Sequence, residues 1–443
     1  MSIARIELGT AVGKVPVETQ NDRQTVSRLK SLILNAQLYG LAGITFLSFL
    51  PRFSHVQEYA FFLLLAVGLA FCLAQKINPF VRTRLDLVLV AFVVWVLFTV
   101  PFSVDPIYSF AEWRKVVGHI LVFYWAMFVL RFSKGREPAG IVLAAVVLGS
   151  LALSILALDD FLSRGGTWRD REVRAVAPSS DYNWLTTYLV LVVPVILGWL
   201  ANQRGAAART LGLFAVTAAG FAQIAAYTRA GWIAHFSQLV AFLYMVRRRQ
   251  VVVWFFVGAI LAASTVIALS STRYQKDTLD PWTFAARVKT WQLGIEQVLH
   301  HPIVGAGFGN DTFSKVYTAQ IEADSTKGPV EKVLPGLHNT FMMVLMGSGV
   351  PALILFAFMF IRIVTELGAG HRRVDYLPKG IGLLAPAISL AVLGFAVRNA
   401  FDYMFAGSVA NLFWILVAVG LSVKDDPANS NGQDEPGRTS RSI

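Results

Sequence analysis

The sequence predicts an all-α polytopic membrane protein, and two features of its composition lead to this prediction. Of its 443 residues, 55% are hydrophobic and only 15% are charged, whereas a soluble domain carries about 25% charged residues. The apolar residues also gather into continuous runs of helical length, without the alternation of a membrane β-barrel. We therefore expect a bundle of membrane-spanning helices.

About twelve such runs follow one another along the chain, the first beginning near Leu32. Each is close to the ~20 residues that a helix needs to cross a bilayer. We expect spans at residues 31–50, 57–75, 87–103, 115–131, 138–158, 184–201, 209–227, 231–246, 250–270, 338–361, 380–397 and 404–423.

Basic residues predict the orientation of these spans. With the N-terminus in the cytoplasm, every short inner loop is basic, as the positive-inside rule requires. These loops hold Lys76, Arg82, Arg84, Arg131, Lys134, Arg136, Arg204, Arg209, Arg247, Arg248, Arg249, Arg362, Arg372, Arg373 and Lys379. The expected organisation is a cytoplasmic tail (1–30), a transmembrane domain (31–423) and a disordered cytoplasmic tail (424–443).

Two outer loops are large, residues 159–183 and 271–337, and the second, between spans nine and ten, is long enough to fold into a helical cap. Asp280 can cap a helix that begins at Pro281. The stretch "HHPIVGAGFGN" (300–310) should end that helix. Residues at helical spacing form one apolar stripe on it: Phe284, Val288, Trp291, Ile295 and Val298.

The sequence shows no pattern of a metal centre, a cofactor site or an ion-coupled transporter. No Asp or Glu lies well inside a predicted span, where such transporters place carboxylates. The one cysteine, Cys72, lies within a span, and His300 and His301 have no carboxylate at ligand spacing. His119 and His235, near span centres, are typical of hydrogen-bonded helix packing.

Several charged residues lie on the outer side, against the positive-inside rule. Arginine stays charged and binds phosphate oxygens in bidentate fashion, so a group of arginines there suits an anionic headgroup. The residues are Arg174 in loop 159–183, Arg229 in "YTRAG" (227–231), Arg287 on the loop helix, and Arg398 and Asp402 between the last two spans.

His338 and Asn339 begin the tenth span. The free N–H groups of a helix start add partial positive charge, and Asn339 is a favourable N-cap. A neutral imidazole, with a reference pKa of about 6.5, can accept a proton from an attacking hydroxyl. A base beside a cationic cradle suits group transfer from a lipid diphosphate.

Each residue also has a plainer interpretation. A lone His338 is more often an anchor at the membrane interface, and Arg229 could reach lipid phosphates. Arg287 could pair with Glu296 or Asp280. Arg398 and Asp402, four residues apart, could simply pair with each other. The functional interpretation depends on all of them meeting at one place.

Three stretches resemble the O-antigen ligase family, within the superfamily that includes O-antigen polymerases and protein O-oligosaccharyltransferases. They are "YTRAG" (227–231), "RVKTWQLGIEQVLHHPIVGAGFGN" (287–310) and "LHNTFMMVLMGSGVP" (337–351). The last one runs His338, Asn339, nine residues and Gly349, which is close to the ligase pattern.

The resemblance implies a metal-independent, inverting glycosyltransferase with a class C-like architecture. It implies a bacterial inner-membrane location, a periplasmic active site, and transfer of O-antigen glycan from undecaprenyl diphosphate to a hydroxyl of the lipid A–core acceptor. By position, Arg229 and Arg287 would bind the diphosphate and His338 the acceptor hydroxyl. Arg174 and Arg398 join the diphosphate site on topology alone, with Asn339, Asp402 and Trp291 as supporting residues.

The expected partners are the lipid-linked glycan donor, the lipid A–core acceptor and membrane lipids, with no cofactor and no nucleic acid. We expect a monomer. The nearest alternative is an O-antigen polymerase that extends the lipid-linked glycan. More remote alternatives are a lipid or ion transporter, which would show midplane carboxylates and internal repeats, and a non-enzymatic scaffold.

Overall fold

A computed structural model of the chain describes residues 20–133, 138–168, 173–176, 181–246, 281–324, 333–368 and 383–424. Within these ranges every regular element is a helix. The long helices are α1 (Gln20–Leu47), α2 (Ser54–Gln75), α3 (Asp86–Thr99), α4 (Pro106–Phe132), α5 (Pro138–Ser163), α6 (Tyr182–Asn202), α7 (Ala206–Ala225), α8 (Arg229–Val246), α11 (Pro281–His300), α14 (Thr340–Gly368), α15 (Leu384–Asn399) and α16 (Gly407–Lys424). Two short helices, α12 (Thr312–Val316) and α13 (Thr318–Asp324), follow α11.

The all-α membrane class predicted from composition is confirmed. Among the described residues, 7 helical segments are long and apolar enough to cross a membrane. They are Pro51–Gln75, Pro106–Phe132, Pro138–Ser163, Tyr182–Asn202, Ala206–Ala225, Thr340–Gly368 and Gly407–Lys424. Asp86–Phe102 and Leu384–Asn399 are shorter apolar helices.

Helices α1 and α8 overlap the predicted spans 31–50 and 231–246 but are more polar than those seven segments. Helix α1 begins at Gln20, inside the predicted N-terminal tail, and its first turns are polar. Helix α8 carries Arg229, His235 and Gln238. The predicted ninth span, 250–270, lies outside the described residues.

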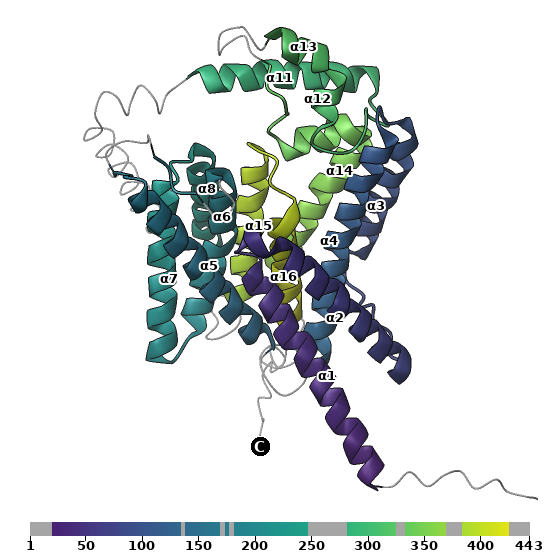
Figure 1. Ribbon diagram of the computed structural model, residues 1–443, viewed down its shortest axis with the longest axis vertical. Coiled ribbons are helices and arrows are strands. Elements are labelled where there is room, and N and C mark those ends of the chain that lie inside the picture. Colours follow the sequence, from purple (N-terminus) through teal and green to yellow (C-terminus); the bar gives the residue numbers. More distant parts are fainter. Residues whose placement is uncertain are drawn as a thin grey trace, which may run out of the picture.

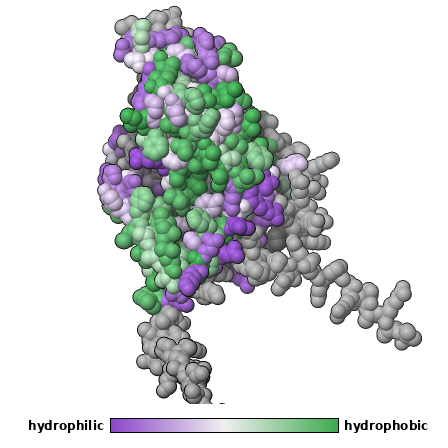
Figure 2. Space-filling model, turned by 90° about the vertical axis from the view of Figure 1, so that its right-hand side faces the viewer, coloured by the Kyte–Doolittle hydropathy of each residue, from purple (hydrophilic) through white to green (hydrophobic). Residues whose placement is uncertain are grey.

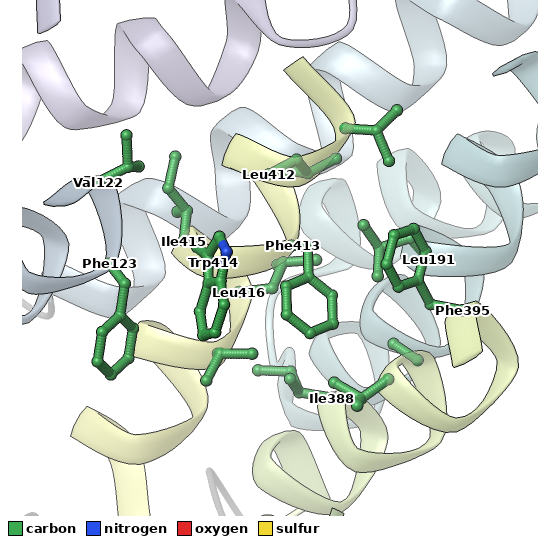
Figure 3. Packing of buried hydrophobic residues seen from close by; sticks show 14 of the residues in the cluster. Val122, Phe123, Leu191, Ile388, Phe395, Leu412, Phe413, Trp414, Ile415 and Leu416 are labelled. Atoms are coloured by element: carbon green, nitrogen blue, oxygen red, sulfur yellow. The ribbon is translucent and has the colours of Figure 1, made fainter. Parts of the chain in front are cut away.

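Helices α15 and α16 lie in the centre of the bundle, and the other helices surround them (Figure 1). Helix α15 packs against α6, α8 and α14, while α16 packs against α4. Phe123, Phe395, Phe413 and Trp414 meet there with Leu191 in a closely packed core (Figure 3). This central position lets the short connection between α15 and α16 reach the same region as the start of α14.

A broad hydrophobic surface covers the middle of the molecule, with hydrophilic side chains gathered towards its two ends (Figure 2). Many large apolar side chains on α3, α4 and α14 are exposed, including Leu87, Ile107 and Ile354. In water such a surface would be unfavourable, but it matches the hydrocarbon interior of a bilayer.

Helices α11, α12 and α13 form a cap over one end of the bundle (Figure 1). This confirms the prediction of a helix beginning at Pro281, whereas its place on the outer side of the membrane stays a prediction; Asp280 lies outside the described residues. The predicted apolar stripe is partly wrong, because Ile295 is 49% exposed. The buried face instead carries small residues, Ala286, Thr290 and Gly294, together with Val298, which lets α11 approach α14 closely.

Helix α14 contains a sharp kink where Ser348 and Gly349 leave the helical conformation. Gly349 has φ +79° and ψ 179°, a conformation that is essentially restricted to glycine. A Cβ at this position would stand 2.0 Å from the carbonyl oxygen of Ile303. Gly349, part of the motif that resembles the family pattern, therefore has a structural role.

The glycine segment 302–309 supplies the hydrogen bonds that the kink removes. The N–H of Ala306 donates to the Met346 carbonyl at 2.8 Å, and the N–H of Gly307 donates to the Gly347 carbonyl at 2.9 Å. The N–H of Val350 in turn donates to the Pro302 carbonyl at 2.8 Å. The cap is thus joined by backbone hydrogen bonds to a helix that crosses the membrane, and buried backbone groups on both sides are satisfied.

His119 makes the contact between helices that was expected, from α4 to α16, whereas the contact of His235 lies within α8. Nδ1 of His119 lies 2.8 Å from Oδ1 of Asn411, and Nδ1 of His235 lies 3.0 Å from Oε1 of Gln238.

Candidate functional site

The candidate site lies where the cap meets the bundle, and Asp402 is at its centre. This residue follows α15 in the short connection to α16, and only 6% of its surface is exposed. Its Oδ1 lies 3.1 Å from Nδ1 of His338, and its Oδ2 lies 3.5 Å from Nη2 of Arg398. The carboxylate therefore contacts both an imidazole and a guanidinium.

His338 lies two residues before α14, in a left-handed backbone conformation with φ 46°. The conformation is uncommon for a residue other than glycine, and it is held by contacts on both sides. Before it, Trp291 Nε1 of the cap donates to the Leu337 carbonyl at 2.7 Å. After it, the Asn339 side chain accepts a hydrogen bond from the Met342 N–H at 3.1 Å, the contact of an N-cap.

A network of fully buried polar residues joins the start of α14 to the α15–α16 connection. The Thr340 hydroxyl lies 2.7 Å from Oδ1 of Asn399 and 3.0 Å from the Asp402 carbonyl oxygen. Oδ1 of Asn399 also accepts from the Met404 N–H at 3.1 Å. Thr340 and Asn399 thereby hold the segment that contains His338 at a fixed distance from the segment that contains Asp402.

Arg398 is fully buried, and most of its guanidinium lacks a partner within the described part of the chain. Nη2 donates to Oδ1 of Asn183 at 2.9 Å, but Nε and Nη1 have no hydrogen-bond partner there. Buried polar groups are nearly always paired, and unpaired charged groups are the most costly. The unpaired N–H groups of Arg398 therefore indicate a place where a further acceptor would be favourable.

Arg287 of α11 shares this property, since its Nε is buried and lacks a partner among the described residues. Burial lowers the pKa of its guanidinium, the charge of Asp402 opposes that shift, and the charge of Arg229 adds to it. Arg287 thus lies between a carboxylate and another cation, and it stays charged at any physiological pH because the ordinary pKa of arginine is above 12.

The pKa of Asp402 is lowered below its ordinary range by the groups around it. Burial acts in the opposite direction and raises it, but the hydrogen bond with His338 and the charges of Arg398, His338 and Arg287 outweigh burial. Asp402 is therefore a carboxylate at neutral pH. The charge of Asp181 also acts on Arg398. The negative charges of Asp402 and Asp181 therefore oppose the positive charges of Arg229, Arg287 and Arg398, and these described residues together carry a net positive charge.

Arg229 is held in place by the tight connection between α7 and α8. Tyr227 adopts a left-handed conformation with φ 47°. The N–H of Gly231 donates to the Thr228 carbonyl at 3.1 Å. A Cβ on Gly231 would stand 2.2 Å from the Thr186 side chain, which explains the glycine of "YTRAG" by close helix packing. Arg229 begins α8, its side chain is exposed, and its charge acts on Arg287.

Arg174 reaches the site through an aromatic ring. Its guanidinium lies 4.5 Å from the ring centre of Tyr182 at the start of α6, a cation–π distance. Tyr182 also lies close enough to Arg287 to influence its pKa. Loop 159–183 therefore ends next to the cap helix.

The structure brings together the eight residues predicted from sequence, with Arg174 at the edge of the group. Sequence reasoning missed Tyr182, Asn183, Thr340 and Asn399. Asn183 lies two residues after the helix cap Asp181, at the end of loop 159–183, and this position was a usable signal. Thr340 and Asn399 carried no such signal, because a threonine and an asparagine at helix ends are ordinary capping residues.

These features define the class of protein as a multi-pass helical membrane protein with a cationic, imidazole-bearing site beneath a helical cap. A family model described as O-antigen ligase matches residues 213–357, which include Arg229, Arg287, Trp291 and His338. An O-antigen ligase of Salmonella typhimurium is 24% identical over 349 residues, covering 73% of this chain and 80% of the relative. Over residues 213–357 the chain is thus similar to the O-antigen ligase family.

Proposed function

We propose that this protein is an O-antigen ligase that moves glycan from undecaprenyl diphosphate to a hydroxyl of the lipid A–core acceptor, without a metal ion. The observation that carries the proposal is the contact between His338 and Asp402 beside Arg287, whose buried Nε lacks a partner among the described residues. That arrangement combines a base with a site for a polyanion, and the family match supports this substrate class.

In the proposed reaction, His338 is the general base. Nδ1 donates its hydrogen to Asp402, so Nε2 carries the lone pair and faces the acceptor. Asp402 stabilises the imidazolium that forms when Nε2 takes the proton from the acceptor hydroxyl. The acceptor oxygen forms a bond to the anomeric carbon as the bond from that carbon to the diphosphate oxygen breaks. Attack from the opposite face inverts the anomeric configuration.

The leaving undecaprenyl diphosphate takes the bonding electrons, and we assign Arg229 and Arg287 to its developing negative charge. Arg174 is in a position to extend this cationic surface through Tyr182. Arg398 has no exposed surface, so we assign it a positioning role, holding Asp402 from below. Binding the two lipids beneath one cap would supply a further part of the rate enhancement through proximity.

The direct test uses purified protein in detergent with undecaprenyl-diphosphate-linked glycan and lipid A–core. We expect glycan on the core, detected by mass spectrometry, with the anomeric configuration inverted. Elongated prenyl-linked glycan without any product on the core would identify a polymerase and contradict the proposal.

Substitutions test the assigned roles. His338→Ala should lower the rate at least 100-fold, because general-base catalysis contributes about 10²–10⁴-fold. His301→Ala, which changes an exposed histidine at the end of the cap helix, is the matched control and should be active. Normal turnover by His338→Ala would exclude its role as a base.

Arg287→Lys should also be impaired, because an ammonium group keeps the charge but loses the planar fork that holds two phosphate oxygens. We expect kcat/KM for the donor to fall about tenfold or more, from the loss of one charge-assisted hydrogen bond in a buried site. Arg52→Lys, in the exposed outer connection between α1 and α2, is the matched control. Equal kinetics for the two variants would remove Arg287 from the donor site.

A further inference from the structure

A second cluster of charges lies at the opposite end of the bundle from the cap, around Glu366 near the end of α14. Its carboxylate contacts three basic side chains that come from three separate elements. The distances are 3.3 Å to Nη1 of Arg84, 3.2 Å to Nη2 of Arg362 and 3.1 Å to Nζ of Lys424. We call these four residues the Glu366 cluster. None of them belongs to the site beneath the cap.

The Glu366 cluster holds three positive charges and one negative charge among the described residues. In sequence, the adjoining segments 369–382 and 425–426 carry three basic and three acidic residues. A buried carboxylate needs one or two partners to offset its desolvation. Three basic side chains are more than the Glu366 carboxylate needs, which leaves positive charge available for another partner.

The three basic residues differ in exposure and in their contacts. Lys424 is mostly buried and bonded within the protein, since its Nζ also donates to the Glu366 carbonyl oxygen at 2.7 Å and its side chain is 26% exposed. The side chain of Arg84 is 76% exposed and that of Arg362 is 36% exposed. Each of these guanidinium groups contacts the carboxylate through one nitrogen, and both side chains are partly or largely accessible from outside the described structure. Two adjacent arginines are therefore positioned to bind an oxyanion.

Apolar surface begins directly beside these arginines. Helices α3 and α14 pack against each other (Figure 1). Their outward residues are exposed and apolar, and they run from the two arginines towards the middle of the bilayer. On α3 they are Leu87, Val90 and Val94, and on α14 they are Ile361, Phe358 and Ile354. This surface lies in the hydrophobic band of the molecule, where lipid chains surround the protein.

We propose that the Glu366 cluster binds the phosphate of an anionic phospholipid, with the acyl chains lying along α3 and α14. The cations are at the boundary of the apolar surface, where the headgroup phosphate of a lipid stands, and the arrangement matches an amphiphile from head to tail. Basic residues near a membrane surface attract anionic headgroups. Glu366 fixes the arginines in place and leaves a net positive charge for the lipid.

Native mass spectrometry of the detergent-solubilised full chain tests this proposal. Phosphatidylglycerol and phosphatidylcholine with identical acyl chains are compared as probes. We expect several-fold more bound phosphatidylglycerol, and Arg84→Gln should reduce its affinity about fivefold. Arg204→Gln, another exposed arginine on an inner loop, should leave the affinity unchanged. Because Arg84 is 76% exposed, its replacement is not expected to unfold the protein.

Three results would overturn the proposal. The wild-type chain could bind the two lipids equally, or Arg84→Gln and Arg204→Gln could behave alike, and either result would make the Glu366 cluster a purely structural ion-pair group. Alternatively, inorganic phosphate at millimolar concentration could displace phosphatidylglycerol and stabilise the protein equally, which would show a site for small anions that does not use the apolar surface.

Discussion

Asp402 is the residue on which the geometry of the candidate site depends, because two different groups use its carboxylate. One oxygen contacts His338 and the other contacts Arg398. Removing the charge would affect both contacts at once. It would free the imidazole to rotate and leave a fully buried guanidinium facing no carboxylate. The effects of substitutions at these three positions should therefore not be additive.

The first prediction concerns Asp402→Asn and the pH dependence of stability. The pKa of Asp402 is lowered in the folded chain, so its ionised form stabilises the protein above the ordinary carboxyl pKa of about 3.9. Breaking a buried ion pair costs about 3 kcal/mol. We expect Asp402→Asn to melt at a lower temperature than the wild-type chain at pH 7.

This difference in melting temperature should shrink as the pH falls below about 4, because Asp402 of the unfolded wild-type chain then takes up a proton while the folded chain, with its lowered pKa, still holds a carboxylate. Thermal unfolding in detergent at a series of pH values provides the measurement. A difference that persists unchanged at pH 3 would show that the asparagine acts through packing and not through the lost charge.

The second prediction concerns Thr340, which touches neither proposed substrate but joins the chain segments of His338 and Asp402. Thr340→Val keeps the shape and removes the hydroxyl. We expect kcat to fall about tenfold with an unchanged KM for the donor, and Thr340→Ser to restore most of the activity. A catalytic group misplaced by about 1 Å can lower the rate about 10²-fold, so a tenfold fall in kcat corresponds to a smaller displacement of His338 relative to Asp402. Equal kcat for the valine and serine variants would exclude this positioning role.

At the residue scale, the sequence predicted the charged members of the site because charge on the outer side is conspicuous against the positive-inside rule. It did not predict which of these charged residues are fully buried and which are partly exposed. Arg398 and Arg287 look alike in sequence, yet one is fully buried behind Asp402 and the other is half-buried on the cap. Burial depends on the packing of α15 against α6 and α8, which no local pattern encodes.

At the scale of elements, α14 and the cap depend on each other. The kink at Ser348 and Gly349 frees backbone carbonyls in the middle of an apolar helix, and the cap satisfies two of them. The third, the Ser348 carbonyl, accepts from Trp95 Nε1 at 3.0 Å. Bilayer segments can contain irregular backbone only where protein groups satisfy it in this way.

The third prediction follows from the Gly349 conformation. Gly349→Ala would place a methyl group against the Ile303 carbonyl at a φ of +79°, so we expect a loss of at least about 2 kcal/mol of stability. Gly118→Ala in α4 is the control, since a Cβ there meets nothing within 4 Å. That variant should be neutral or slightly more stable. Thermal unfolding of the two variants side by side would decide, and equal melting temperatures would disprove the account of the kink.

The cap helix shows why an apolar pattern can predict an element and still misplace its face. The stripe that includes Ile295 predicted a helix in the correct place. However, the helix turns Ala286, Thr290 and Gly294 towards the protein and leaves Ile295 and Leu299 exposed. At a membrane surface, exposed apolar residues contact the lipid interface, so the rule that apolar residues face the core no longer selects one side.

At the scale of the whole molecule, the positions of most apolar helices were predictable from the sequence, whereas their arrangement was not. Runs of apolar residues predicted eleven regions that are helical in the structure. Helix α15 is short and lies at the centre, while longer helices such as α5 and α7 lie at the periphery (Figure 1). A helix that is surrounded by protein and one that is surrounded by lipid are both apolar on all sides, so hydropathy alone cannot separate them.

The fourth prediction tests the orientation of the molecule in the membrane. In a Cys72→Ser background, a cysteine is placed at Gln320 on the cap or at Ala207 at the start of α7, both exposed. With the cap in the periplasm, a membrane-impermeant maleimide should label position 320 in intact spheroplasts. It should label position 207 only after the membrane is permeabilised. The reverse pattern would place the cap in the cytoplasm and contradict the proposed topology.

The backbone hydrogen bonds between the cap and α14 also constrain how the chain can be assembled. The ribosome synthesises residues 302–309 before it synthesises α14, so the N–H groups of Ala306 and Gly307 have no carbonyl to meet until α14 has entered the bilayer. During biogenesis these N–H groups of the cap must therefore stay hydrogen-bonded to water. The cap can pack onto the bundle only after α14, which follows it in the chain, has been inserted. A translation product that stops before Thr340 would lack the donor site, even though it already contains Arg229 and Arg287.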